Sequence, residues 1–309
     1  MEQGRKSCCA PRRAVEEAEI SNRTNGAGIA RPKAGIRFPE KMNWIEGGHF
    51  LMGTDDTDGI QQDREGPVRE CKVETFLLDR YAVTNEEFMH FVKETGYRTE
   101  AEKFGWSFVF YQLIPPRAAL EVQQVASTPW WYAVGQAVWF RPEGPQSSIS
   151  ERMDHPVVHI SWNDAQAFCQ WAGKRLPTEI EWEYAARGGL EQKKYPWGDE
   201  LAPDGKHRCN IWQGTFPTVN TEADGFLGTA PAQSFPVNGY GLFNMSGNVW
   251  EWCQDLFEKN TQTGNAARSV RGGSYLCHES YCNRYRVAAR TSNTMDSSSG
   301  NIGFRCAAQ

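Results

Sequence analysis

The stretch HPVVHISWNDAQAFCQWAGKRLPTEIEWEYAARGG, residues 155–189, decides the fold because it contains two complete helix signals in succession. Ser161 and Asp164 stand three residues apart, and so do Thr178 and Glu181, which is the spacing of a capping box at a helix start. Each apolar stripe that follows ends at a glycine, a common helix stop. The stretch therefore predicts two short helices joined by a loop.

The sequence on either side of this stretch predicts short strands, one more helix and a long irregular region. Upstream, residues 43–53 predict two strands joined as a hairpin at a Gly-Gly pair. Residues 71–83 predict a further strand, followed by a helix that Thr84 and Glu87 cap. Downstream, short apolar pieces alternate with Gly, Asn, Pro and Ser, so we expect the C-terminal third to be mostly loop.

Composition favours one compact, loop-rich domain and excludes several classes of partner. The chain has 309 residues with 29 glycines, 16 prolines and 12 tryptophans, and no linker interrupts residues 43–309. We expect a single α+β domain with little regular secondary structure. The net charge of −5 lacks the basic footprint of a nucleic-acid-binding protein. The apolar runs are only a few residues long, so no membrane span is expected.

Residues 1–42 differ in composition from the rest of the chain. They carry nine Lys or Arg, five Asp or Glu and a single aromatic residue, Phe38. Such a segment buries too little apolar area to offset its ordering entropy, so we predict a disordered tail. It has no apolar core of a secretory signal, which favours a cytoplasmic location. We interpret Cys8 and Cys9 as incidental thiols and assign the tail no role.

Cys277 and Cys282 form the most specific chemical signal in the chain. They lie in RGGSYLCHESYCNRYR, residues 271–286, and neither a strand nor a helix brings residues five apart together. A bend at Glu279-Ser280 would allow either a disulfide or a two-thiolate metal site. Two thiolates without nearby His or Cys at zinc spacing suit Cu(I) better than a structural zinc.

Six arginines surround the two cysteines in sequence, against only two carboxylates, between residues 268 and 306. Neighbouring cations lower the pKa of a thiol, although these arginines could equally pair with carboxylates and stack on aromatic rings. The residues concerned are Arg268, Arg271, Arg284, Arg286, Arg290 and Arg305.

His155 and His159 have the spacing of a zinc-binding helix, but the segment HPVVH is predicted to be extended. In a strand, residues four apart are about 13 Å from each other, too far to share one metal ion. We therefore expect two histidines with separate hydrogen bonds.

A second cluster is rich in oxygen atoms. Asn210, Asp224 and residues 244–251 offer amide, carboxylate and free carbonyl oxygens on tight turns. Ca²⁺ favours this mixture, but there is no D-x-D-x-D-G loop, so turn-forming Asn and Asp residues are the commoner explanation.

Several long segments together resemble the formylglycine-generating enzyme family, also called sulfatase-modifying factors, in its bacterial cytoplasmic form. The matching segments are residues 155–189, 195–200, 209–231, 238–252, 271–290 and 303–308. The resemblance covers nearly everything from Asn43 to the end. It implies a single irregular domain over residues 43–309 with a C-type-lectin-like core.

The resemblance also implies an activity. The family uses O₂ to oxidise the cysteine of a C-x-P-x-R motif in a sulfatase polypeptide to Cα-formylglycine. Cys277 and Cys282 match the two thiols that hold Cu(I). The other matching positions, in the oxygen and substrate pocket, are Ser274, Tyr281, Trp250 and, in the substrate groove, Asn301.

The resemblance further implies two calcium sites, which reverses the interpretation of the oxygen cluster as simple turns. One site would use Asn210, the Ile211 carbonyl, Asp224 and the Phe226 carbonyl. The other would use Asn244, the Gly247 and Val249 carbonyls, and Glu251.

The chain departs from the family pattern at a few positions. Cys169 and Cys306 match one structural disulfide of secreted relatives, and we expect them to be reduced neighbours. Ala185 and Val287 stand where those relatives have the second pair. Met295 stands where a proline is familiar, which could loosen a turn that faces the substrate.

Two other functions stay open at this stage. The alternative is a non-catalytic paralogue that binds sulfatases or other peptides, although such relatives lack the thiol pair. An iron enzyme of the ergothioneine-pathway type needs histidines from an extra N-terminal helical domain, and only His49 and His90 precede His155. A monomer is slightly favoured over an oligomer.

Overall fold

The computed structural model describes residues 11–13, 35–115, 121–258 and 267–309. The expectations for Cys8 and Cys9, and for most of the predicted tail, therefore lie outside the described residues.

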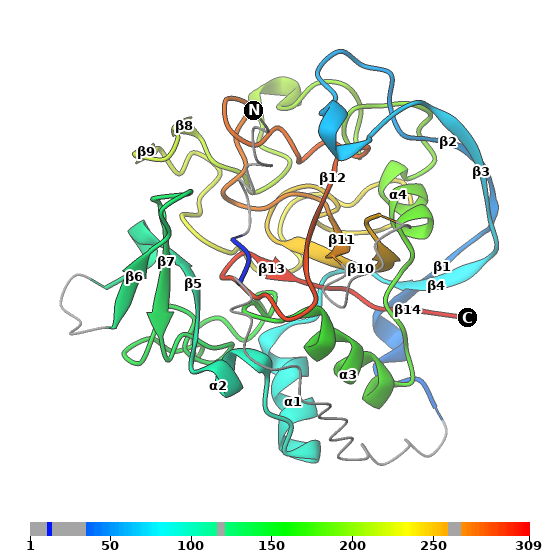
Figure 1. Cartoon of the computed structure of the whole chain (residues 1–309). Coiled ribbons are helices and arrows are strands. Elements are labelled where there is room, and N and C mark those ends of the chain that lie inside the picture. Colours follow the sequence, from blue (N-terminus) through cyan, green and yellow to red (C-terminus); the bar gives the residue numbers. More distant parts are fainter. Residues whose placement is uncertain (1–10, 14–34, 116–120, 259–266) are drawn as a thin grey trace.

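Helices and strands are short throughout the described chain (Figure 1). The α-helices are α1 (Asn85–Thr95), α2 (Glu100–Phe104), α3 (Trp162–Ala172) and α4 (Glu179–Arg187). The 3₁₀ helices are η1 (Pro39–Lys41), η2 (Gln61–Asp63), η3 (Tyr111–Leu113) and η4 (Pro203–Gly205). The strands are β1 (Met42–Ile45), β2 (Gly48–Met52), β3 (Arg69–Val73), β4 (Phe76–Asp79), β5 (Trp106–Phe110), β6 (Val122–Gln124), β7 (Trp131–Gly135), β8 (Gly214–Thr215), β9 (Val219–Asn220), β10 (Trp250–Leu256), β11 (Ala267–Arg271), β12 (Arg290–Thr294), β13 (Ile302–Gly303) and β14 (Ala307–Ala308).

The three helices predicted from capping boxes all form, with both hydrogen bonds of each box present. Each ends at a glycine in the left-handed region, where a residue without a Cβ is favoured. A fourth box, Thr99 with Glu102, starts α2 and was not predicted. Among the described residues no α-helix follows α4, as the sequence indicated.

The predicted hairpin around Gly47-Gly48 is wrong, although both of its strands exist. β1 pairs with β4, and β2 pairs with β3, each in an antiparallel register. The two strands are therefore adjacent in sequence but belong to different sheets. A Gly-Gly pair supports a hairpin turn, but here the pairing with later strands prevails.

The site-bearing part of the fold is a four-stranded sheet in the order β12-β11-β10-β13. Its strands come from the last 60 or so residues and are joined by long loops, one of which carries the two cysteines. The sheet β5-β7-β6 lies to one side of it, and α1 to α3 lie beneath it in the view of Figure 1.

The two largest buried clusters hold these layers together. In the larger one, aromatic rings of α1 and α3 pack edge-on, with Phe91 and Phe168 at 5.6 Å between ring centroids. The smaller one lies under α4 and includes Trp182 and Val287. Edge-on aromatic packing and apolar burial supply the stability that such short elements cannot provide alone.

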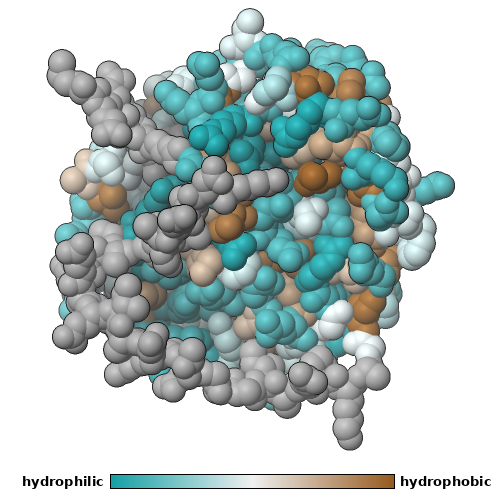
Figure 2. Space-filling view, turned by 45° about the vertical axis from the view of Figure 1, so that its right-hand side comes forward, coloured by the Kyte–Doolittle hydropathy of each residue, from teal (hydrophilic) through white to brown (hydrophobic). Residues whose placement is uncertain are grey.

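The face of the molecule shown in Figure 2 is mainly hydrophilic, with hydrophobic residues scattered among polar ones. None of the described helices combines the length and hydropathy that crossing a membrane requires.

The predicted domain boundary at residue 43 lies inside the packed region. Arg37 N donates to the Ala172 carbonyl at 2.9 Å, and the buried Lys41 pairs with Glu87 at 2.7 Å. Residues 11–13 also contact the sheet, as described below. The prediction of a disordered tail thus differs from the structure for residues 11–13 and 35–42, because a few side chains in a polar segment find specific partners.

Candidate active site

The sulfur atoms of Cys277 and Cys282 lie 3.2 Å apart. The backbone nitrogens of Tyr281 and Cys282 both donate to the His278 carbonyl, at 3.0 and 2.7 Å, and this closes a tight turn. The sharp bend predicted between the cysteines is confirmed. A disulfide would require about 2.05 Å, so the two sulfurs are not bonded to each other.

Both cysteines are buried, with exposed fractions of 0% and 1%. Cys277 forms no disulfide bond, whereas Cys282 is in a disulfide-bonded form that does not involve Cys277. A site that uses both sulfurs as thiolates therefore requires Cys282 to be reduced first.

Two donors lie next to the sulfur atoms. The backbone nitrogen of Ser274 is 3.4 Å from the Cys277 sulfur. The guanidinium of Arg284 is 4.0 Å from the Cys282 sulfur and also pairs with Asp63 at 2.5 Å. A backbone N–H and a cation at these places favour the anionic form of a thiol.

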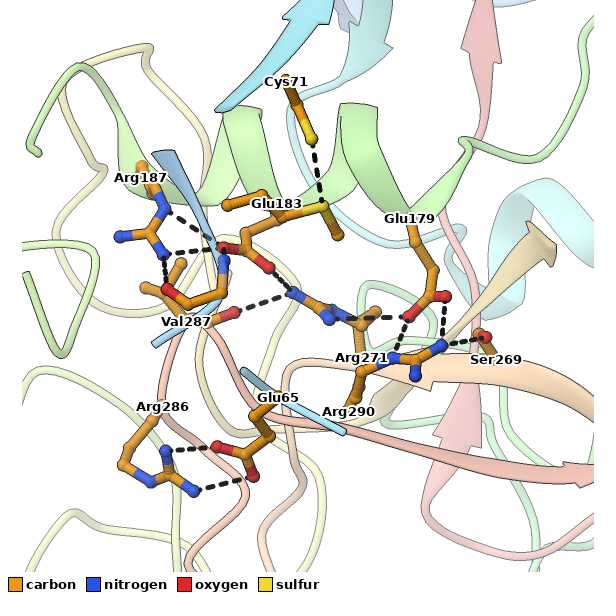
Figure 3. Close-up of polar contacts among 12 residues, drawn as sticks. Glu65, Cys71, Glu179, Glu183, Arg187, Ser269, Arg271, Arg286, Val287 and Arg290 are labelled. Carbon is orange, nitrogen blue, oxygen red and sulfur yellow. Dashed lines mark hydrogen bonds and ion pairs between the residues drawn. The ribbon is translucent and has the colours of Figure 1, made fainter. Parts of the chain in front are cut away.

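The other arginines near the cysteines in sequence serve a different purpose. Arg271 and Arg290 share Glu179, and Arg271 also reaches Glu183, while Arg286 pairs with Glu65 (Figure 3). These side chains are almost fully buried, so each cation needs its carboxylate. For these arginines, pairing with carboxylates is confirmed, and within the described chain Arg284 is the one of the six that contacts a sulfur of the cysteine pair.

Ser274, Asn301 and Trp250 form a connected path that ends at the cysteines. The amide nitrogen of Asn301 donates to the Ser274 hydroxyl at 3.0 Å. The backbone nitrogen of Trp250, on β10, donates to the Asn301 carbonyl at 2.9 Å. The indole N–H of Trp250 has no hydrogen-bond partner among the described residues. The structure thus brings these three predicted residues together beside Cys277.

Tyr281 lies in an aromatic wall beside the turn. Its ring stacks on Phe216 with centroids 4.2 Å apart and an angle of 6°, and the edge of Trp130 meets it at 4.8 Å. Rigid aromatic stacking fixes the position of the tyrosine relative to the adjacent Cys282.

The first predicted calcium set converges in space. Gln213 donates its side-chain amide both to the Ile211 carbonyl and, at 2.8 Å, to Asp224. The Asn210 side-chain oxygen is buried and has no hydrogen-bond partner among the described residues. Burial raises the pKa of Asp224, against the hydrogen bond from Gln213. The Phe226 nitrogen donates to Asp224 at 3.1 Å, so Phe226 is adjacent. This donor set fits a hard cation.

The second predicted calcium set fits less directly. Asn244 likewise has a buried side-chain oxygen without a partner in the described chain. Gly247 and Val249 follow on the same tight loop, where Asn244 and Gly247 both have positive φ. However, both carboxylate oxygens of Glu251 accept from the buried Arg305 at 2.7 Å. Since a carboxylate offers about four acceptor positions, a cation would have to share Glu251 with Arg305.

His155 and His159 have separate partners, as predicted. His155 contacts the Thr229 hydroxyl, and His159 contacts the Ser107 hydroxyl, each at 2.9 Å. Burial lowers the pKa of His159 to about 3, so its ring is neutral.

Cys169 and Cys306 are both free, with their sulfurs 3.5 Å apart, which agrees with the expected reduced neighbours. Burial raises the pKa of Cys306 well above its usual range. Ala185 and Val287 both lie in the apolar cluster under α4.

Sequence analysis missed a pocket that holds the side chain of Arg13. This guanidinium donates to the carbonyls of Asp296 and Trp106, at 2.9 and 2.7 Å. It also lies over the rings of Phe104 and Trp106, at 4.1 and 4.5 Å from their centroids. An adjoining groove of about 1180 Å³ is lined by Arg12, Phe104, Trp106 and other residues of β5 to β7.

Met295 is part of the turn beside this pocket. The turn is closed by a hydrogen bond from the Ser297 nitrogen to the Thr294 carbonyl at 3.1 Å. The Thr294 and Ser297 hydroxyls are 2.6 Å apart. The turn therefore keeps a regular hydrogen bond without the proline expected there.

No three His, Cys, Asp or Glu side chains converge as a metal cluster within the described ranges. Fold and site together define a class: an irregular α+β domain of the C-type-lectin-like kind that carries a convergent pair of buried sulfurs.

Comparisons with known proteins identify the family. A model described as the sulfatase-modifying factor enzyme 1-like domain matches residues 30–309. The formylglycine-generating enzyme of Thermomonospora curvata is 57% identical over 279 residues, which are 85% of this chain and 92% of that protein. The chain therefore belongs to the formylglycine-generating enzyme family.

Two further comparisons bear on fold and function. A Bos taurus protein named inactive C-alpha-formylglycine-generating enzyme 2 is 49% identical over 270 residues, covering 86% of this chain and 87% of that protein. The solved structure of PvdO from Pseudomonas aeruginosa matches with a TM-score of 0.60 and 23% identity, covering 87% of this chain and 94% of that one. The second likeness supports the fold alone.

Proposed function

We propose that this protein uses O₂ to oxidise the cysteine of a C-x-P-x-R motif in sulfatase polypeptides to Cα-formylglycine, with copper held by Cys277 and Cys282. The observation that carries the proposal is the pair of convergent sulfurs, 3.2 Å apart on a tight turn. The T. curvata relative, named as a formylglycine-generating enzyme, supports the same activity.

The donor set fits Cu(I). Two sulfur ligands are soft donors, and no third His, Cys, Asp or Glu completes a metal cluster with them in the described chain. A pair of sulfurs leaves room for the sulfur of a substrate. When bound, copper supplies the redox chemistry through which O₂ is activated.

The residues around the sulfurs would prepare them for this role. The Ser274 nitrogen and the Arg284 guanidinium favour thiolates, because each places positive charge near a sulfur. Asn301 holds the Ser274 hydroxyl in place. The indole N–H of Trp250 is a free donor among the described residues, available to a bound molecule.

The overall reaction requires a reductant. The C–S bond of the peptidyl cysteine breaks and a C=O bond forms, giving an aldehyde, hydrogen sulfide and water. O₂ accepts four electrons, of which the cysteine side chain supplies two. The other two, with two protons, come from a thiol reductant. Such a reductant would also convert Cys282 to the thiol that copper binding needs.

The direct experiment combines the protein with Cu(I), a thiol reductant and a C-x-P-x-R peptide under air. We expect an aldehyde in the peptide by mass spectrometry, and none without copper. A protein with copper bound in stoichiometric amount that produces no aldehyde would refute the proposed activity.

Copper binding can be tested independently of activity. Cys277→Ser and Cys282→Ser are expected to lose tight Cu(I) binding, measured by competition with a chelator of known affinity. Cys71→Ser is the matched control, because Cys71 is a free cysteine on β3, away from the pair. Undiminished copper affinity in both site variants would contradict the assignment.

The fold alone does not exclude a purely binding role, because the Bos taurus relative is named as inactive. The sulfur pair favours the enzyme. A binding protein would retain the peptide in the same assay without converting it.

A further inference from the structure

Residues 11–13 are a short piece of the tail that contacts β12 and β5, and they are drawn in dark blue near the centre of the view in Figure 1. The Asn293 side chain donates to the Pro11 carbonyl at 3.2 Å. Arg12 donates to the Ser292 hydroxyl at 2.8 Å. This piece therefore follows the end of β12, some 280 residues away in sequence.

Arg13 is the anchor of this contact. Its exposed fraction is 6%, and its backbone nitrogen donates to the Ser297 hydroxyl at 2.9 Å. The guanidinium occupies the pocket of carbonyls and rings described above. Burying a guanidinium is costly unless its donors are satisfied. Both terminal nitrogens of Arg13 donate hydrogen bonds, the cation lies over two aromatic rings, and Nε alone has no partner among the described residues. The pocket therefore fits the planar end of an arginine side chain.

The sequence around Arg13 repeats the proposed substrate motif. Residues 9–13 read Cys-Ala-Pro-Arg-Arg, which is C-x-P-x-R. Two described residues, Pro11 and Arg13, occupy positions that the motif specifies. Asn293 contacts the carbonyl of Pro11, and the arginine pocket holds the side chain of Arg13. The motif cysteine is Cys9, which lies outside the described residues.

A chain of contacts connects this pocket to the cysteine pair. Arg13 reaches the hydroxyl of Ser298 at 3.3 Å. The Ser299 hydroxyl donates to Asn301 at 2.7 Å, and Asn301 in turn holds Ser274 beside Cys277. Cys9 stands two residues before Pro11, which corresponds to a reach of about 7 Å of extended chain. Residues 11–13 thus contact residues 292–298, and the chain continues from there to Asn301.

We propose that residues 9–13 are a built-in substrate and that Cys9 is a modification site, converted to formylglycine within the same chain. The tail would hold Pro11 and Arg13 in the subsites that an external peptide uses, and would compete with that peptide. This inference rests on the proposed function.

The conversion at Cys9 follows the same balance as the external reaction. Its C–S bond breaks, its β-carbon becomes an aldehyde, and sulfur leaves as hydrogen sulfide. O₂ is the oxidant and accepts four electrons to give two molecules of water, and one molecule of water is consumed to supply the aldehyde oxygen. A thiol reductant supplies the two remaining electrons and two protons.

The test uses the full chain with Cu(I) and a thiol reductant under air, in the presence of an external C-x-P-x-R peptide. After proteolysis, mass spectrometry and aldehyde capture are applied to the fragment that contains Cys9. We expect an aldehyde at Cys9, with a rate per chain that does not change on dilution. If the external peptide is converted while Cys9 stays a cysteine, the inference about Cys9 is refuted and the proposed function stands. If neither the external peptide nor Cys9 is converted although copper is bound, the proposed function itself is refuted.

Variants separate the motif from its neighbours. Arg13→Ala is expected to abolish conversion of Cys9 while the external peptide is still converted, with a lower apparent KM because its competitor is weakened. Cys8→Ala and Arg5→Ala are matched controls outside the motif and should leave Cys9 conversion unchanged. An Arg13→Ala protein that converts Cys9 normally, or a rate per chain that rises with protein concentration, would overturn the intramolecular proposal.

Discussion

His159 is a fully buried imidazole that the fold holds in the left-handed backbone region, at φ 60°. Its ring contacts the Ser107 hydroxyl, which lies 2.9 Å from the Ser298 hydroxyl beside the arginine pocket. A histidine that stays neutral because of burial is a source of acid sensitivity, since the unfolded chain binds a proton that the folded chain does not.

The sign of this effect follows from the pKa values. Burial lowers the pKa of His159 to about 3 in the folded chain, below an unfolded value of about 6.5. Its contribution to stability is therefore complete above about pH 6.5 and is lost as the pH falls toward 3, by up to about 1.4 kcal/mol per pH unit.

We expect His159→Asn to flatten the dependence of unfolding free energy on pH between about pH 6.5 and pH 4. Asparagine tolerates a positive φ and can still bond to Ser107. Urea unfolding at several pH values measures the difference, with the exposed His49→Asn as control. Equal slopes in the variant and the parent protein would show that His159 is not responsible.

At the level of single residues, the sequence predicted the cysteine pair, the bend between the two cysteines and the separate hydrogen-bond partners of His155 and His159. It left open whether the arginines act on the thiols, because both ion pairing and a thiol contact produce the same local excess of positive charge. Only the positions of Glu65, Glu179 and Glu183, far away in sequence, decide between them. The arginine pocket was missed because backbone carbonyls, which leave no trace in a sequence, form most of it.

Helix α4 packs against β2, β3, β10 and β11 and so links the early strands to the C-terminal sheet. Its first residues begin at the Thr178 capping box, and its buried face supplies Glu179 and Glu183 to the arginines of the C-terminal sheet (Figure 3). The capping box therefore fixes where α4 begins, and this sets the positions of Glu179 and Glu183 relative to the arginines that they pair with.

Thr178→Ala is expected to lower the free energy of unfolding by about 1 kcal/mol, because the Glu181 nitrogen at 3.2 Å loses its acceptor. Thr178→Ser keeps the hydroxyl and should recover most of the loss. Chemical denaturation measures both variants. Equal destabilisation by alanine and serine would mean that the methyl group, rather than the cap, is important.

Helices were easier to predict than strand pairing. Capping boxes and glycine stops are local, so α1, α3 and α4 could be identified from a few adjacent residues. Pairing is a long-range choice, and β14 at the C-terminal end joins β4 across more than 200 positions. The turn signal at Gly47-Gly48 is local, so it could not reveal that β1 and β2 pair with later strands instead of with each other.

At the level of the whole molecule, bound calcium would link loops to each other and so stabilise the folded chain. The first calcium site that the resemblance implies would join the loop at Asn210 and Ile211 to Asp224, in a region with almost no regular secondary structure. An ion that binds only the folded chain stabilises it by about 2.7 kcal/mol at a hundredfold excess over its Kd.

A calcium chelator is therefore expected to lower the melting temperature of the parent protein. Asp224→Asn should start from a lower melting temperature and show no further response. Asp204→Asn, at an exposed position with positive φ, should respond as the parent does. A chelator response that persists undiminished in Asp224→Asn would rule out this site.

Long-range ion pairs, such as the Glu65–Arg286 pair of Figure 3, also govern the order in which a newly made chain can fold. Asp63 meets Arg284 across 221 positions, and Glu65 meets Arg286 across the same separation. On the ribosome, these acids emerge long before the cations that will neutralise them, and their burial has to wait. These ion pairs can therefore become buried only when synthesis is nearly finished. Until then the unfinished polypeptide remains accessible to proteases and chaperones.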